Sequence, residues 1–167
     1  ARERAIVRNP VSCGNQSIES RYGASSAVHN PFIALCDHDT TEKYGNVYGF
    51  SLLYSGNFTA GVELNPYNCA RVYMGINPFQ FEYVLHSEEM FQTPEVVMVY
   101  SADGLGGMSR IYHRLYRTRL CRGKYRDSDR LVLINNWEAT YFNFTEDTII
   151  DIARKAATIG VDTMVLD

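Results

Sequence analysis

An aromatic ring and a carboxylate occupy comparable places near the end of the sequence. Trp137 comes shortly after the apolar run Leu131–Asn135, and Asp167 comes directly after the apolar run Thr163–Leu166. An indole face packs against the CH face of a pyranose ring, and a carboxylate accepts hydrogen bonds from hydroxyl groups. If the fold brings these two side chains together, their chemistry suits the binding of a sugar.

The segment between them predicts a strand, a helix and a second strand parallel to the first. Leu131–Asn135 has the short, continuous apolar pattern of a strand buried on both faces. A helix is expected from Thr145, whose hydroxyl can cap its first turn, to Gly160, which ends it. Thr163–Leu166 then supplies the second strand.

This crossover decides whether the indole and the carboxylate meet. Both strands of such a unit run the same way, so their carboxyl ends lie at one edge of the sheet, roughly 5 Å apart if the strands are neighbours. Parallel barrels carry their catalytic loops at that edge. We therefore expect Trp137 and Asp167 to converge there.

Residues 1 to about 101 read as a series of short strands, which favours an antiparallel sandwich. The predicted strands are rich in aromatic and β-branched residues, and turn residues separate them. They are Ile6–Arg8, Ile18–Arg21, Phe32–Cys36, Val47–Tyr54, Ala60–Leu64, Ala70–Gly75, Phe79–Leu85 and Val96–Tyr100. The first residues have the character of mid-domain sequence, so we expect the sandwich to be incomplete at its amino end.

The glycine-rich turn Asp103–Met108 opens a predicted helix with an apolar stripe that continues to Tyr116. Its glycines loosely resemble a dinucleotide-binding fingerprint. However, the third glycine is out of place and no second parallel strand follows promptly. Glycines that serve a tight strand-to-helix turn are the better interpretation.

Basic residues gather between Arg110 and Arg130. A groove for phosphates is one interpretation, but base-stacking aromatic residues do not interleave with the arginines in a consistent pattern. Arginines that pair with carboxylates across a domain boundary, or that are simply solvated, are the favoured interpretation.

The composition bounds the class of protein. The chain has 167 residues, of which 46% are hydrophobic and 13% aromatic, which is ample for a core. A net charge of −3 gives no strong attraction to nucleic acid or to an anionic membrane, and no apolar run of about eighteen residues is present. No C-x-x-C pair occurs among the scattered cysteines, so we expect no metal site and reduced, partly buried thiols in a cytoplasmic protein. These cysteines are Cys13, Cys36, Cys69 and Cys121.

Several blocks of the chain carry a family resemblance. Val132–Phe142, preceded by Arg122–Arg126 and followed by Val165–Asp167, closely resembles the α-galactosidases of glycoside hydrolase family 36. The likeness covers nearly the whole chain, and Asn135–Phe142 is long enough to be a specific signal. The upstream blocks are Asn30–Leu35, Tyr48–Phe58, Met74–Phe79, Phe91–Glu95 and Gly104–Ser109.

The resemblance implies a mainly β fold in three parts. Residues 1–103 would be the later part of an antiparallel β-supersandwich, and residues 104–130 a connecting helix and linker. Residues 131–167 would then be the first β-α-β unit of a catalytic (β/α)8 barrel.

The resemblance also implies hydrolysis of terminal non-reducing α-galactosyl residues from galactosides such as melibiose, raffinose and stachyose, with retention at the anomeric carbon. Retention needs two carboxyl groups about 5 Å apart. In the family both come from later barrel strands, so we expect no catalytic residue in this chain and no activity from the chain alone. A cytoplasmic homo-oligomer is implied, with a galactoside as its ligand and with no cofactor, metal, nucleic acid or membrane partner.

Two substrate-binding residues carry over from the family. Trp137 matches the tryptophan at the end of the first barrel strand, which walls the galactose pocket. Asp167 matches the first of two adjacent aspartates that bind galactose hydroxyls. Asn136 and Tyr141 are weaker candidates for lining the same pocket, whereas the family pattern gives Glu138 a structural place.

Two alternatives stay open. Twelve tyrosines and eight phenylalanines also suit a non-catalytic carbohydrate-binding or assembly module, because exposed aromatic rings stack on sugars. A related transferase that moves galactose to another sugar is the other alternative.

Overall fold

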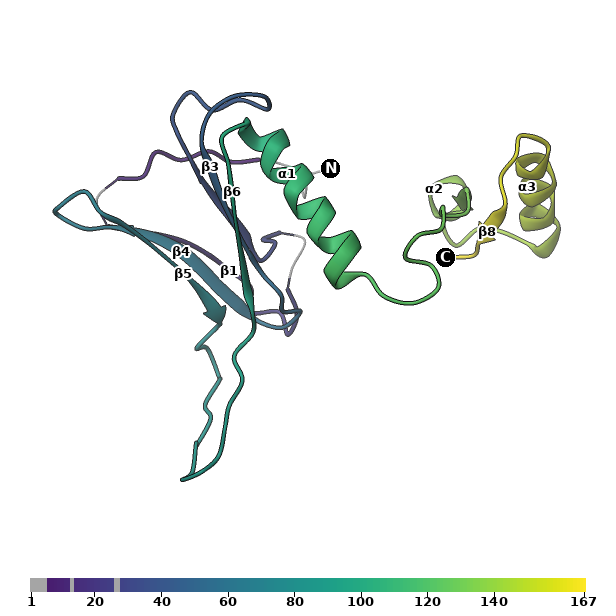
Figure 1. The fold of residues 1–167 in the computed structure, drawn as a ribbon. Helices are drawn as coiled ribbons and strands as arrows, with labels where there is room; N and C mark the ends of the chain where they lie inside the picture. The colour runs from purple at the N-terminus through teal and green to yellow at the C-terminus, as the bar shows by residue number, and fades with distance from the viewer. Residues whose placement is uncertain (1–5, 13, 26–27) are drawn as a thin grey trace. The chain divides into compact units, whose positions relative to one another are not determined.

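The computed structural model describes residues 6–12, 14–25 and 28–167, which form two compact units (Figure 1). The first unit is Ala1–Tyr116 and the second is Arg117–Asp167. The three-part division expected from the sequence, with boundaries near residues 103 and 130, stays a prediction.

The first unit contains two three-stranded antiparallel sheets, so the predicted antiparallel architecture is confirmed. One sheet has the order β1-β4-β5, with strands Gly14–Glu19, Phe58–Leu64 and Ala70–Ile76. The other has the order β2-β3-β6, with strands Phe32–Cys36, Val47–Leu52 and Val96–Ser101.

Apolar side chains from both sheets form the core of the sandwich. Leu52 on β3 is 3% exposed, and Phe58 and Ala60 on β4 are fully buried. Partly buried side chains from the neighbouring strands, including Ile18 and Ile33, pack against them. Because successive side chains of a strand point to opposite faces, each strand contributes alternate residues to this layer.

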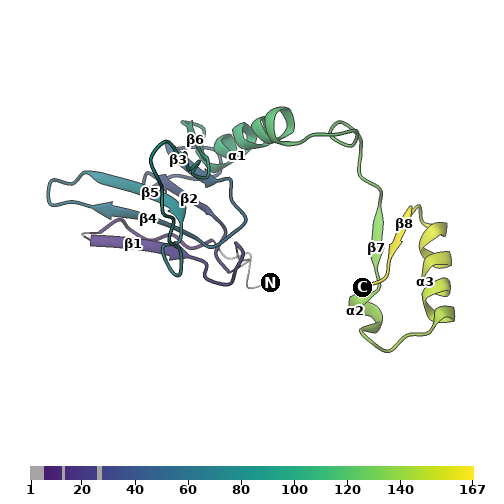
Figure 2. The same ribbon diagram turned by 90° about the horizontal axis from the view of Figure 1, so that it is seen from below.

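Helix α1 (Gly104–Leu115) covers the β2-β3-β6 sheet (Figure 2). Its Met108 and Tyr112 pack on Val47 of β3. A Cβ at Gly49 would lie 2.6 Å from the Met108 sulfur and 2.8 Å from a Tyr112 ring carbon. Gly49 is therefore what allows the helix to approach the sheet closely. A short π-helical segment, η2 (Tyr116–Leu120), follows α1.

The first turn of α1 is closed by a neighbouring loop. Gly104 has a φ of +67°, which favours glycine, and it turns the chain from β6 into the helix. The N–H groups of Leu105 and Gly106 donate to the carbonyls of Thr41 and Glu42, at 3.0 and 2.9 Å. The turn interpretation of these glycines is confirmed, because N–H groups that would have to hold a phosphate already have partners.

Tyr112 makes the free energy of unfolding of the first unit depend on pH in the alkaline range. Its side chain is buried, its hydroxyl donates to the Val97 carbonyl at 3.0 Å, and burial raises the pKa of Tyr112 to about 12. An unfolded chain releases the same proton near pH ~10. Between pH ~10 and about pH 12 the unfolded state therefore binds fewer protons than the folded state. The contribution of Tyr112 to the free energy of unfolding is retained below about pH 10 and falls as the pH rises toward about 12.

We expect Tyr112→Phe to flatten this dependence. The free energy of unfolding, measured by denaturant titration between pH 9 and pH 12, should fall less steeply than in the parent protein. Tyr44→Phe is the control, because Tyr44 is 65% exposed. Equal slopes for the Tyr112 variant and the parent would show that Tyr112 does not cause the alkaline loss.

The predicted strand Phe79–Leu85 is wrong. Residues 77–95 form an irregular excursion between β5 and β6 that extends away from both sheets (Figure 1). Prolines at positions 78 and 94 cannot donate to a sheet ladder. The aromatic residues pack on one another instead, with the rings of Tyr83 and Phe91 4.5 Å apart.

Other predicted strand boundaries also differ. Ile6–Arg8 forms no strand, and the strand predicted over Ile18–Arg21 runs earlier, as Gly14–Glu19. The ladder explains this shift, because β1 pairs with β4 from Gly14↔Leu64 to Glu19↔Thr59.

The second unit contains the predicted crossover. Strand β7 (Leu133–Asn135) is parallel to β8 (Thr163–Val165), and helices α2 (Trp137–Thr140) and α3 (Glu146–Thr158) lie between them in sequence. The Thr145 hydroxyl caps α3 by accepting the Thr148 N–H at 3.3 Å. Both the parallel pairing and the Thr145 cap were predicted, and both are confirmed.

The first strand of this pair is not buried on both faces. It is three residues long, and Leu133 is 55% exposed. The physical reason is that a two-stranded sheet with one crossover helix cannot enclose its strands. Among the described residues, no helix has the length and the apolar character needed to cross a bilayer.

Candidate functional site

The β7–β8 pair brings the two sequence-predicted residues to one end of a sheet. Asn135 is paired with Val165 at the carboxyl ends of the strands. Trp137 and Asp167 each follow this pair by two residues. Figure 2 shows the segment after β8 returning to α2, which begins at Trp137. The structure thus places both residues where the crossover predicts, while their role in binding stays a prediction.

The Asn135 side chain links the two residues. Its Oδ1 accepts the backbone N–H of Trp137 at 2.7 Å, and its Nδ2 donates to Oδ2 of Asp167 at 2.9 Å. The first bond is an Asx turn, which leads the chain from β7 into α2. Because a backbone N–H can only donate, Oδ1 must face Trp137 and the NH2 group must face Asp167. Asn135 therefore gives the Asp167 carboxylate a fixed donor.

Asn136 anchors the same strand ends from inside the unit. It is fully buried, its Nδ2 donates to Oγ1 of Thr140 at 2.9 Å, and its Oδ1 accepts the backbone N–H of Asp167 at 2.9 Å. Its own N–H donates to the Val165 carbonyl at 3.3 Å. The expectation that Asn136 lines a pocket is wrong, because none of its surface is accessible. An Asn-Asn pair at the end of a predicted strand is a sequence signal for this role, because asparagine side chains hydrogen-bond to nearby backbone groups.

Aromatic neighbours hold the Trp137 ring. Trp137 is half-buried, and its ring meets those of Tyr141 and Phe142 edge to face, with centroids 5.3 and 4.9 Å away. Tyr141 has a φ of +47°, in the left-handed region, at the point where α2 ends. Its hydroxyl donates to Glu138 Oε2 at 3.3 Å. Tyr141 therefore supports the indole and engages Glu138, which agrees with a structural place for Glu138.

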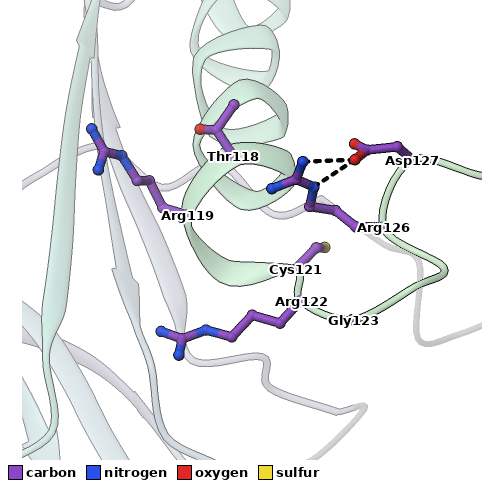
Figure 3. A pocket seen from close by; sticks show the side chains of 7 residues that line it. All are labelled: Thr118, Arg119, Cys121, Arg122, Gly123, Arg126 and Asp127. Carbon is purple, nitrogen blue, oxygen red and sulfur yellow. Dashed lines mark hydrogen bonds and ion pairs between the residues drawn. The ribbon is translucent and has the colours of Figure 1, made fainter.

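Side chains of residues 118–127 line a separate, open pocket of about 440 Å³ (Figure 3). In the figure Arg126 faces Asp127, whereas Arg119 and Arg122 point away from this pair. Two nitrogens of Arg126 bind Asp127 Oδ2, at 2.8 and 2.7 Å, and this hydrogen bonding holds the pKa of Asp127 below its ordinary value. The arginine–carboxylate pairing favoured from the sequence is present, but it is local rather than across a domain boundary. The pocket shares no lining residue with the strand-end site, which consists of Asn135, Asn136, Trp137, Tyr141 and Asp167.

No metal site is evident in the part of the chain that the structure describes. No three His, Cys, Asp or Glu side chains of these residues lie in an arrangement that would hold a metal ion. The expectation of partly buried thiols is wrong for Cys36, Cys69 and Cys121, which are exposed free thiols at strand ends and in loops, and Cys13 lies outside the described residues. What the strand-end site offers is a supported indole and a carboxylate with one oxygen already engaged, which is the chemistry of hydroxyl recognition rather than of metal binding.

Comparison with known families gives two consecutive matches. The glycosyl hydrolase family 36 N-terminal domain matches residues 1–86, and melibiase matches residues 90–167. The chain belongs to glycoside hydrolase family 36. The resemblance inferred from Val132–Phe142 and the upstream blocks is confirmed.

A family 36 enzyme of known sequence and structure is similar over nearly the whole chain. Alpha-galactosidase AgaA of Geobacillus stearothermophilus is 59% identical over 166 residues, which are 99% of this chain and 23% of that protein. Its crystal structure superposes with a TM-score of 0.92, again over 99% of this chain and 23% of the other. A variant of AgaA in complex with stachyose is 58% identical, with a TM-score of 0.90 and the same coverage.

The family 36 chain described here thus spans about a quarter of the length of these relatives. Both of its units fall within the superposed region, because the match covers 99% of the chain. The sandwich with its covering helix and the crossover that carries Trp137 and Asp167 are therefore shared features of the family 36 architecture.

Proposed function

We propose that the full-length protein is a retaining α-galactosidase, which removes terminal α-linked galactose from galactosides such as melibiose, raffinose and stachyose. The observation that carries this proposal is the 59% identity to an α-galactosidase across nearly the whole chain. The complex of an AgaA variant with stachyose supports a galactoside as the ligand class. We assign the nucleophile and the acid/base to later strands of the barrel, as the family resemblance implies.

In this proposal Trp137 and Asp167 bind galactose. The indole lies against the CH face of the sugar, and its edge contacts with Tyr141 and Phe142 keep the ring in place. Asp167 Oδ2 is engaged by Asn135, which leaves Oδ1 to accept a hydrogen bond from a sugar hydroxyl. Both contacts hold the sugar while the carboxyl groups of the later strands react.

Three features of the full-length protein belong to the same proposal. A (β/α)8 barrel is supported by the parallel crossover β7–α3–β8 and by the melibiase match. A homo-oligomer is supported by the exposed apolar side chains of residues 77–95, such as Val84 and Met90, which are 72% and 89% exposed. A cytoplasmic location is supported by the exposed free thiols, which persist in a reducing compartment.

The same aromatic excursion favours a second candidate function. An exposed cluster that includes Phe81, Tyr83 and Phe91 suits a module for carbohydrate binding or assembly, in which the sandwich acts and the crossover does not. Galactose binding by the sandwich after deletion of residues 131–167 would favour this module over the proposed enzyme.

One experiment tests the proposed activity. The full-length protein should release p-nitrophenol from p-nitrophenyl α-galactoside, and proton NMR should show the α-anomer of galactose as the first product. Residues 1–167 alone should release none, because the reacting carboxyl groups lie elsewhere in this proposal. A β-anomer as first product, or comparable turnover by residues 1–167, would contradict the assignment.

A further inference from the structure

The strand-end site contains a residue, Asn135, whose side chain is placed to act through Asp167. The backbone of Asn135 is held by the strand pair, because Asn135 of β7 is paired with Val165 of β8. Its amide Oδ1 is committed to the Trp137 N–H and its Nδ2 reaches the Asp167 carboxylate. A single rigid amide therefore connects the end of β7, the start of α2 and the residue after β8.

We propose that Asn135 is a positioning residue for galactoside binding, which holds the Asp167 carboxylate with one oxygen presented to the sugar. This inference rests on the proposed function of the site. Three constraints act together: the strand pairing fixes the Asn135 backbone, the Trp137 N–H fixes the amide orientation, and the NH2 group selects one Asp167 oxygen.

The bond also restricts the rotamers of Asp167. The Asn135 NH2 group donates to a carboxylate oxygen, and such a charge-assisted bond is stronger than one between two neutral groups. Without this donor the carboxylate would sample other rotamers, because Asp167 is exposed and has one further anchor, its backbone N–H on Asn136. Because Asn135 already restricts the Asp167 side chain, Asp167 loses less conformational entropy when a sugar binds.

A double-mutant cycle in the full-length enzyme tests this role. Asn135→Ala should lower kcat/KM for p-nitrophenyl α-galactoside by about 10- to 30-fold, which is within the range for one hydrogen bond to a charged group. In an Asp167→Ala background the same substitution should lower kcat/KM by less than about 2-fold, because residues that act through one another are not additive. The larger part of the Asn135→Ala effect should appear in KM.

Asn135→Asp separates the two bonds of the amide. The variant keeps an oxygen to accept the Trp137 N–H, but its second oxygen replaces the NH2 donor and repels the Asp167 carboxylate. It should therefore lower kcat/KM at least as much as Asn135→Ala. This variant keeps the Asx turn, so the test survives if Asn135→Ala fails to fold.

Asp162→Ala is the matched control. Asp162 Oδ2 accepts the Val132 N–H at 3.0 Å, so it makes a side-chain bond across the same strand pair at its opposite end. We expect this control to lower the melting temperature while leaving kcat/KM within about 2-fold of the parent.

The outcomes are distinct. An Asn135→Ala effect of equal size in both backgrounds would overturn the positioning role, as would unchanged kinetics for Asn135→Ala when Asp167→Ala is impaired. Unchanged kinetics for Asp167→Ala itself would instead remove the substrate site on which the inference rests.

Discussion

Replacing Asp167 with alanine in the full-length protein is expected to lower kcat/KM for p-nitrophenyl α-galactoside by about 10- to 150-fold. A carboxylate oxygen that accepts one hydrogen bond from a sugar hydroxyl contributes about 1.5–3 kcal/mol, and each ~1.4 kcal/mol is a factor of ten in rate. Because hydroxyl contacts strengthen toward the transition state, KM should rise and kcat should fall together.

The structure predicts that this loss is not caused by unfolding. Asp167 is exposed, and its backbone N–H would still donate to Asn136 Oδ1 in the variant. Steady-state kinetics should therefore be compared with the melting temperature of the same preparation. Parent-like kinetics would take Asp167 out of the pocket, and a melting temperature that falls in proportion to activity would make it a structural residue.

The convergence of Trp137 and Asp167 was predictable because it depends on chain topology. When a single helix returns the chain to the starting edge of the same sheet, the two strands run in one direction, and the register Asn135↔Val165 places both residues at one edge. The Thr145 cap was predictable for a similar reason, since it is a local contact within one turn.

What the sequence could not supply was the partner of each polar group. Asn135 and Asn136 are adjacent and chemically identical, yet one is exposed and reaches a carboxylate and the other is fully buried. That difference arises because Asn135 ends strand β7, whereas Asn136 lies in the turn into α2 and accepts a hydrogen bond from the returning chain at Asp167. The false strand Phe79–Leu85 failed similarly, because its aromatic pattern satisfies strand propensity while no neighbouring strand pairs with it.

Replacing Asn136 with alanine is expected to destabilise the strand-end site by about 2–3 kcal/mol. The variant leaves the Asp167 N–H without its acceptor and removes the bond to Thr140 Oγ1, and the Asn136 side chain that makes both bonds is fully buried. A buried donor that loses its partner costs about 1–3 kcal/mol, and the lost side-chain volume adds to this. Thr140 itself is less affected, because its hydroxyl also reaches the Asn136 carbonyl at 3.2 Å.

A local measurement is needed, because a multidomain protein does not unfold in a single step. Amide hydrogen exchange of residues 133–141 and 163–167 in the full-length protein should become about 30- to 150-fold faster, since exchange follows the free energy of local opening. Asn143→Ala is the control, because Asn143 is exposed and should shift exchange by less than about 2-fold. If Asn136→Ala exchanged no faster than this control, the buried amide would not be what holds the returning chain at Asp167 against the end of β7.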